Sequence, residues 1–167
     1  MSCRIILVGF MGAGKTTLGK HLSEKLSIPF IDSDQEIEKK MNKTIVQLFK
    51  ELGESKFRIL ESEFIHGLSK TSSFVLATGG GLPCFYDNIL FLNDLGITIY
   101  LKTSSEILTN RILNDINRPL IKGKNKEELN EFVTSSLLER ECFYEKSRFI
   151  LDENHHDIDS ILQIINQ

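Results

Sequence analysis

The chain has 167 residues, of which 41% are hydrophobic and 26% charged, and its formal net charge is −3 at pH 7. This length suits one compact domain, and this composition is that of a globular protein rather than of a disordered or fibrous one. Because the chain is slightly acidic and no apolar run approaches the ~20 residues of a membrane helix, we expect neither nucleic acid nor a membrane among its partners.

Hydrophobic patterning predicts strands that alternate with helices. Cys3–Val8 is a continuous apolar run, as expected for a strand that is buried on both faces. The other predicted strands are Pro29–Asp32, Phe74–Ala77, Ile97–Leu101 and Phe149–Leu151. The predicted helices are Thr16–Leu26, a helix capped by Thr44 with Gln47 at the reciprocal position, Ser55–Leu68, Ser104–Asn114, Glu127–Lys146 and Ile158–Ile165.

This alternation predicts how the elements assemble. Strands joined by helices form right-handed crossovers, which give a parallel sheet between two layers of helices. We therefore expect an α/β fold, a three-layer α/β/α sandwich with a five-stranded parallel sheet, in a single domain over residues 1–167. Ligands of such sheets bind at the carboxyl ends of the strands.

A phosphate-binding loop follows the first predicted strand. Residues 9–16 match G-x-x-x-x-G-K-[ST] in full, between a buried strand and an amphipathic helix. The backbone N–H groups of such a loop cradle phosphates, its lysine reaches the β- and γ-phosphates, and its hydroxyl residue ligates Mg²⁺. The sequence has no D-x-x-G, which argues against a GTPase. The predicted nucleotide-binding residues here are Gly12, Ala13, Gly14, Lys15, Thr16 and Thr17.

Two carboxylates end the second predicted strand. If the chain stays extended through Asp32 and Asp34, both side chains point to the same side. One acid can then serve the metal and the other can accept a hydrogen bond from a substrate hydroxyl. Helix capping is the competing interpretation, although capping needs only one of the two acids.

Four arginines stand out by their positions. Arg58 lies three residues before Glu61 on a predicted helix, where a surface ion pair would also explain it. Arg140 falls on the inward stripe of its helix, where a guanidinium must pair internally or face an anion. Arg111 raises the same question, but its side chain can also extend to the surface.

The fourth arginine, Arg118, lies in a stretch without apolar periodicity, residues 115–126, that is rich in cations. We predict a mobile lid there, because a loop arginine can stabilise a transferred phosphoryl group and a closing loop excludes water. A solvated surface loop is the alternative.

Three glycines, Gly79–Gly81, follow the third predicted strand. A single glycine would be enough for a turn. Three glycines at a strand's carboxyl end allow the backbone to approach a ligand closely and to donate N–H groups to it.

The N-terminus and the cysteines indicate a cytoplasmic protein. Cys3 leads directly into an apolar strand, and a glycine-rich loop stands where a signal peptide would need its cleavage site. With Cys84 and Cys142 the cysteines are odd in number, far apart and without a metal-binding pattern, so we expect reduced thiols.

Taken together, these motifs resemble the shikimate kinases, small P-loop enzymes with a nucleoside-monophosphate-kinase-like fold that phosphorylate the 3-hydroxyl of shikimate. The resemblance spans nearly the whole chain. It rests on residues 9–16, Asp32–Asp34, Phe57–Glu61, Thr78–Gly81, Asn117–Leu120 and Glu139–Arg140 with Tyr144, in the family's order.

The resemblance implies a role for each matching residue. Lys15, Asp34 and Arg118 would be catalytic, with Asp34 binding ring hydroxyls as the candidate base. Thr16 and Asp32 would hold one Mg²⁺ per subunit. ATP would contact the loop residues together with Arg118, and Arg111 would stack on its adenine. Shikimate would contact Asp34, Arg58, Gly80, Gly81 and Arg140, with the two arginines on its carboxylate.

The resemblance also implies an acceptor-binding helical region at about residues 33–61 and a monomer whose partners are ATP and shikimate. The family's adenine loop corresponds to Asp152–His156, which has no obvious match.

Two other functions remain open from the sequence. Another small-metabolite P-loop kinase, such as a gluconate or nucleotide kinase, would share the architecture, but two arginines on one carboxylate favour an acidic acceptor. A non-catalytic nucleotide-binding regulator would keep the loop, but nucleotide binding alone would not need Asp34, Arg118 and Arg140.

Overall fold

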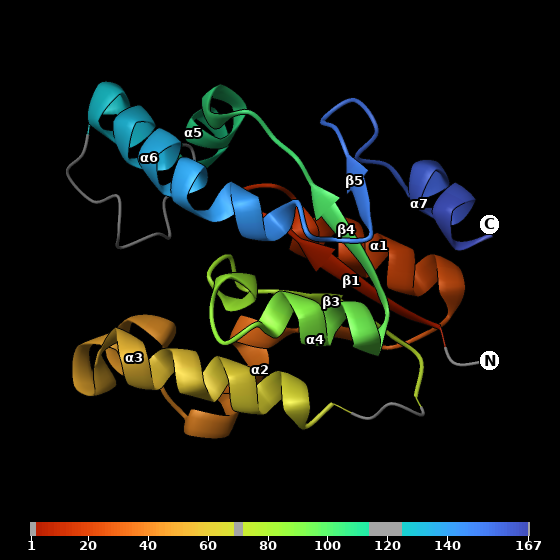
Figure 1. Ribbon diagram of the computed structural model, residues 1–167, viewed down its shortest axis with the longest axis horizontal. Helices are drawn as coiled ribbons and strands as arrows, with labels where there is room; N and C mark the ends of the chain where they lie inside the picture. The colour runs from red at the N-terminus through yellow and green to blue at the C-terminus, as the bar shows by residue number, and fades with distance from the viewer. Residues whose placement is uncertain (1–2, 69–71, 114–124, 167) are drawn as a thin grey trace.

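The computed structural model describes residues 3–68, 72–113 and 125–166. Its strands form one parallel sheet in the order β2-β3-β1-β4-β5 (Figure 1). Their bounds are β1 (Arg4–Val8), β2 (Phe30–Asp32), β3 (Phe74–Ala77), β4 (Ile97–Leu101) and β5 (Phe149–Leu151). The predicted α/β fold and five-stranded parallel sheet are confirmed.

Helices cover both faces of this sheet. In Figure 1, α4 lies in front of the strands and α1 behind them, and α1 also contacts α7. The helical bounds are α1 (Lys15–Leu26), α2 (Ser33–Met41), α3 (Ile45–His66), the short 3₁₀ helix η1 (Leu82–Cys84), α4 (Asn88–Leu95), α5 (Ser105–Leu113), α6 (Lys126–Tyr144) and α7 (Ile158–Ile165). The three-layer sandwich is therefore also confirmed.

The centre of the sheet is apolar on both faces. Ile5, Ile6, Leu7 and Val8 of β1 are completely buried, and so is nearly all of β3. Strand β1 lies between β3 and β4, so helices cover its two faces and strands its two edges, which explains its uninterrupted apolar sequence. The strand ends are therefore held on a rigid core.

Helix α3 is bent where the sequence predicts a break between two helices. The helix spans residues 45–66, but the backbone at Gly53 is non-helical with φ 76°, a value that glycine adopts without strain. The predicted start is confirmed, because Thr44 and Gln47 form a reciprocal capping box. The bend lets the first half pack with α2 around a second apolar cluster of Ile37, Leu48 and Phe57.

The main difference from the sequence analysis lies between Gly81 and Gly96, where no element was assigned. Helix α4 occupies much of this segment, and Ile89, Leu92 and Leu95 are buried. Its eight residues are too few for a clear apolar period, and the exposed Leu90 blurs the pattern further. In the part of the chain that the structure describes, no helix combines the length and apolar character needed to cross a membrane.

Gly96 provides a test of this packing. A Cβ atom at Gly96 would overlap the carbonyl oxygen of Arg4 at the start of β1, and backbone cannot move aside as a side chain can. We predict that Gly96→Ala lowers the free energy of unfolding by about 1–3 kcal/mol in chemical denaturation.

Gly67→Ala is the matched control, because a Cβ there would lie at ordinary distances, 3.4 and 3.5 Å, from its nearest neighbours and the backbone φ is −77°. Equal stabilities of the two variants would contradict this description of the α4–β4 connection.

Candidate active site

Two adjoining cavities open at the carboxyl ends of the strands. The first, which we call the P-loop cavity, has a volume of about 570 Å³ and is lined by the loop between β1 and α1. The second, the arginine cavity, has a volume of about 380 Å³ and is lined by Arg58 of α3 and Arg140 of α6. Four residues line both cavities: Met11, Asp34, Gly79 and Gly80. The two cavities therefore form one continuous site.

The P-loop holds a lysine at its centre. Lys15 is buried, and its Nζ donates to the carbonyl oxygens of Gly9 and Phe10, each at 2.7 Å. Gly12 and Gly14 have φ values of 82° and 96°, which favour glycine and turn the loop around the cavity. The six loop residues predicted to bind nucleotide, residues 12–17, all line this cavity.

Thr16 and Asp32 place two oxygens side by side at this cavity. The Thr16 hydroxyl donates to Oδ2 of Asp32 at 2.9 Å. The other carboxylate oxygen, Oδ1, accepts from the backbone N–H groups of Asp34 and Gln35 and so caps α2. Helix capping, the competing interpretation from the sequence, is therefore confirmed for Oδ1 of Asp32, while Oδ2 lies beside the Thr16 hydroxyl at the cavity, and its role toward a metal stays a prediction.

This pair of hard oxygens fits Mg²⁺, which is usually held by one or two protein ligands and keeps several waters. Among the described residues, no three His, Cys, Asp or Glu side chains cluster into a site that could hold a metal with protein ligands alone. Magnesium shared with a bound phosphate is the metal that suits such a sparse donor set.

Asp34 lies where the two cavities meet. It is placed there by helix α2 and not by the extended strand end that the sequence suggested. The expectation of an extended chain through Asp34 is wrong, because α2 starts at Ser33 and Asp34 lies in its first turn. Burial raises the pKa of Asp34 and Asp32 adds to this, while the charges of Lys15 and Arg58 lower it. Asp34 is thus within electrostatic reach of a cation from each cavity.

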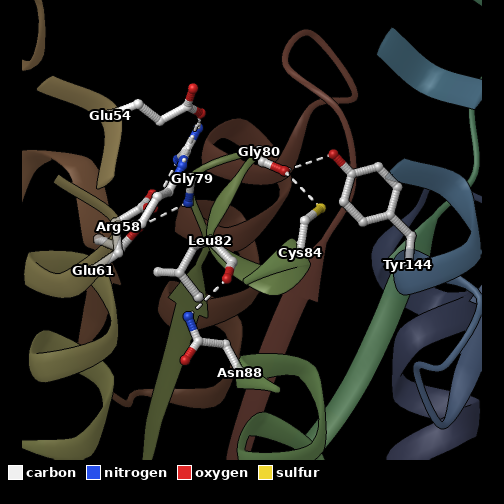
Figure 2. Close-up of polar contacts among 10 residues, drawn as sticks. Glu54, Arg58, Glu61, Gly79, Gly80, Leu82, Cys84, Asn88 and Tyr144 are labelled. Carbon is white, nitrogen blue, oxygen red and sulfur yellow. Dashed lines mark hydrogen bonds and ion pairs between the residues drawn. The ribbon is translucent and has the colours of Figure 1, made fainter. Parts of the chain in front are cut away.

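Arg58 is buried rather than part of a surface ion pair, with 6% of the residue exposed. Its Nη1 donates to Glu61 at 2.7 Å and its Nη2 donates to Glu54 at 2.9 Å (Figure 2). The rings of Phe49 and Phe85 lie 5.4 and 4.6 Å from the guanidinium carbon. Two carboxylates and flanking aromatic rings therefore hold the guanidinium at the wall of the arginine cavity.

Glu61 is the most deeply buried acid of the site, with 1% of the residue exposed. Burial raises its pKa to about 7, although the charge and the hydrogen bond of Arg58 act in the opposite direction. Pairing favours the charged form of both partners, but burial prevails for Glu61 because it lies deeper than Arg58.

Arg140 reaches the same cavity from the opposite side. It is half-buried on the inward stripe of α6 between Val133 and Tyr144, as the sequence predicts. Its guanidinium carbon lies 5.6 Å from the centre of the Phe10 ring, and its Nη1 would lie 3.8 Å from a Cβ at Gly80. The cavity is therefore bounded by the guanidiniums of Arg58 and Arg140. Their helices, α3 and α6, lie far apart in the sequence and on different sides of the strand ends (Figure 1).

The glycine turn after β3 separates these side chains. A Cβ at Gly79 would overlap the Asp34 carboxylate, and a Cβ at Gly81 would overlap the Arg58 guanidinium. The Gly79 N–H donates to the Ser33 hydroxyl at 2.7 Å. Gly79 and Gly81 thus allow charged side chains to pack closely against the turn, whereas a Cβ at Gly80 would lie at ordinary distances of 3.4 Å or more from its neighbours.

Arg111 is exposed at the rim of the P-loop cavity, where its Nη1 donates to the Gly12 carbonyl at 3.2 Å. His156 lines the same cavity from the loop between β5 and α7, at the end of the segment that the resemblance gives as the adenine loop, where no residue was assigned a role. Its Nε2 lies 3.0 Å from the Leu151 carbonyl. The sequence has only four histidines, but no motif marks this one.

Arg118 and the predicted lid, residues 115–126, fall almost wholly outside the described residues.

A P-loop with a buried lysine can bind the phosphates of a nucleotide. The two arginines of the second cavity can bind an acidic ligand, and Asp34 between the cavities can contact a hydroxyl of that ligand. Together with the parallel sheet, this site defines a P-loop kinase.

Comparison with known proteins identifies the family. The shikimate kinase family model matches residues 11–167. A shikimate kinase from Bacteroides thetaiotaomicron is 41% identical over 98% of this chain and 97% of its own length. A crystal structure of shikimate kinase from that organism superposes with a TM-score of 0.89 over 98% of this chain and 96% of the other. The chain belongs to the shikimate kinase family.

Two further solved structures are similar to this chain. A shikimate kinase from Acinetobacter baumannii, solved in complex with shikimate, has a TM-score of 0.86 at 39% identity and covers 99% of this chain and 94% of its own. A gluconokinase from Sinorhizobium meliloti has a TM-score of 0.60 at 14% identity over 98% and 91% of the two chains. The second match shows a common fold alone.

The raised pKa of Glu61 predicts a pH-dependent stability. Between pH 4.5 and about 7 the folded protein keeps the Glu61 proton while the unfolded chain releases it, so this group lowers the free energy of unfolding as pH rises through that window. We predict that Glu61→Gln gains stability relative to the parent protein between about pH 5 and pH 7.5, measured by urea denaturation.

Glu63→Gln is the control, because it removes the same charge from an exposed position of the same helix, and the pH-dependent gain in stability should be larger for Glu61→Gln. A pH-independent difference for Glu61→Gln would show that Glu61 is already ionised at the acidic end of the window.

Proposed function

We propose that this chain transfers the γ-phosphate of ATP to the 3-hydroxyl of shikimate and releases ADP and shikimate 3-phosphate. The observation that carries this proposal is the continuity of the two cavities through Asp34, Gly79 and Gly80. One cavity has the groups for phosphates and the other has two guanidiniums for a carboxylate. Membership of the shikimate kinase family supports this assignment.

In this proposal, ATP occupies the P-loop cavity. Residues 12–17 surround its phosphates, and Lys15 neutralises the β- and γ-phosphates once its amine exchanges the Gly9 and Phe10 carbonyls for phosphate oxygens. Arg111 and His156 lie where the nucleoside would extend, and Arg111 is proposed to stack on adenine. Thr16 and Asp32 would hold Mg²⁺, whose charge would offset that of the phosphates when bound.

Shikimate is proposed to occupy the arginine cavity with its carboxylate between Arg58 and Arg140. A planar guanidinium can donate two parallel hydrogen bonds to a carboxylate, and burial strengthens them. Glu54 and Glu61 fix the Arg58 side chain in advance, so little conformational freedom is lost on binding. The backbone of Gly80 and Gly81 would contact a ring hydroxyl.

Asp34 is proposed to accept a hydrogen bond from the hydroxyl that is phosphorylated. Burial raises the pKa of Asp34, which makes its carboxylate a better proton acceptor than that of an exposed aspartate. The proton passes from the 3-hydroxyl to the Asp34 carboxylate as the hydroxyl oxygen bonds to the γ-phosphorus, and the bond between this phosphorus and the leaving oxygen of ADP breaks. Catalysis then rests mainly on positioning and on charge neutralisation.

The remaining predictions complete this proposal. We propose that residues 1–167 work as one domain and as a monomer, with the helical region at about 33–61 binding the acceptor. Arg118 and a lid at about 115–126 lie outside the described residues, except at the lid's last two positions, and stay predictions from the family resemblance.

The two alternative functions predict different substrates. A gluconate or nucleotide kinase would phosphorylate those acceptors, and a non-catalytic regulator would bind ATP without acceptor-dependent turnover. A coupled assay of ADP release with Mg²⁺, ATP and each acceptor in turn separates the three. We expect turnover with shikimate alone. Turnover of gluconate or of a nucleoside monophosphate, with none of shikimate, would refute the proposal.

We predict that Lys15→Ala lowers kcat for shikimate phosphorylation by about 10²–10³-fold, because a preorganised charge at the transferred phosphate is lost. Lys20→Ala, at an exposed position of the same helix α1, is the control and should retain normal turnover. The same coupled assay measures both. A Lys15→Ala protein with more than a third of the parent kcat would contradict the role of this lysine.

We predict that Arg58→Lys raises the KM for shikimate by about tenfold or more and leaves the KM for ATP within twofold. Lysine keeps the charge but cannot form the two parallel hydrogen bonds of a guanidinium. Arg148→Lys, at an exposed arginine outside both cavities, serves as control. If the shikimate KM of Arg58→Lys were unchanged, Arg58 would not bind the acceptor carboxylate.

A further inference from the structure

The carbonyl group of Gly80 accepts a hydrogen bond from a buried tyrosine, Tyr144. The Tyr144 hydroxyl donates to the Gly80 oxygen at 2.6 Å, and Sγ of Cys84 lies 3.9 Å from the same oxygen (Figure 2). Tyr144 is fully buried, at 0% exposed, so solvent does not compete for this hydrogen bond. Burial also raises the pKa of Tyr144, which keeps the phenol protonated and able to donate.

This hydrogen bond fixes the orientation of the next peptide group. The described residues contain no cis peptide bond, so the planar Gly80–Gly81 peptide directs the Gly81 N–H away from the Gly80 oxygen and hence away from Tyr144. Within the described ranges, no acceptor in the protein is found for the Gly81 N–H. Gly81 lines the arginine cavity. Glycine has no side chain to restrain this peptide, so the restraint must come from a neighbour.

Tyr144 also lies next to Arg140. The two residues are one helical turn apart on α6 and therefore share a face. Burial raises the pKa of Tyr144, and the charge of Arg140 acts in the opposite direction. The Tyr144 hydroxyl thus contacts the glycine turn and lies within electrostatic reach of Arg140.

Packing alone does not require this hydroxyl. The Tyr144 ring packs against the Tyr100 ring of β4, with the ring centres 5.2 Å apart, and a phenylalanine would fill the same volume. Burying a hydroxyl costs free energy that its hydrogen bonds only offset, so a purely structural position would favour phenylalanine. We infer that the hydroxyl is needed for its hydrogen bond to Gly80 rather than for packing in the core.

We propose that Tyr144 is a positioning residue for the acceptor, whose hydroxyl orients the Gly80–Gly81 peptide toward the arginine cavity. It does not touch the acceptor itself. This inference rests on the proposed function, because it takes the arginine cavity as the shikimate site.

Tyr144→Phe tests the inference, and Tyr100→Phe is the matched control. Both substitutions remove one hydroxyl from a buried ring of the same pair, but the Tyr100 hydroxyl lies 3.5 Å from Glu141, outside both cavities. Steady-state kinetics are measured with shikimate and ATP varied in turn, and thermal unfolding is measured in parallel. For Tyr144→Phe we expect a shikimate KM raised about tenfold, a smaller change in kcat and an ATP KM within twofold. Tyr100→Phe should leave all three constants within twofold.

A purely structural hydroxyl would lower the thermal midpoint without a selective change in the shikimate KM, and that result would overturn the inference. Failure of Tyr144→Phe to fold, when Tyr100→Phe folds, would overturn it as well, because the hydroxyl would then serve stability. If the parent protein does not phosphorylate shikimate, the proposed function fails first. If the parent is active and Tyr144→Phe keeps its shikimate KM, only the role of Tyr144 is refuted.

Discussion

The strands of a parallel sheet all run in one direction, so their carboxyl ends lie on the same side of the core. The site of this protein depends on that constraint. The register pairs Leu7 of β1 with Ala77 of β3, and Ala77 in turn with Asp32 of β2. Three strands therefore end side by side, and their next residues begin the P-loop, helix α2 and the glycine turn. Because the carboxyl ends of these strands are fixed on a rigid apolar core, the side chains that follow them keep fixed positions relative to one another, although they come from distant parts of the sequence.

The second feature of the site is the burial of charge. Arg58 and Glu61 are nearly inaccessible and pair with one another, and Asp34 lies between cations of both cavities. A buried ion pair contributes little net stability compared with apolar side chains of similar size, because removing both charges from water is costly. Charges retained under these conditions are best explained by a charged ligand. We propose that the guanidiniums of Arg58 and Arg140 bind a carboxylate, and Glu54 and Glu61 hold Arg58 in place for it.

Much of this arrangement could be predicted from the sequence, for identifiable reasons. The P-loop and the strands have strong local signals, and Arg140 is recognisable because it interrupts an apolar stripe. Other features depend on tertiary contacts. The sequence predicts an extended chain at Asp34, but the Asp32 carboxylate caps α2 and makes Asp34 part of that helix. The burial of Glu61 depends on the glycine turn, which is distant in the sequence. His156 has no local signal at all, and Tyr144 looks like a core aromatic until its hydroxyl meets Gly80.

The central claim is that one continuous cleft holds nucleotide phosphates at Lys15 and an organic acid between Arg58 and Arg140. A crystal structure with shikimate and a non-hydrolysable ATP analogue tests it most directly. The account predicts the carboxylate between the two guanidiniums and a ring hydroxyl beside Asp34, facing the terminal phosphate. A carboxylate bound elsewhere, or a ring turned away from the phosphate, would contradict it.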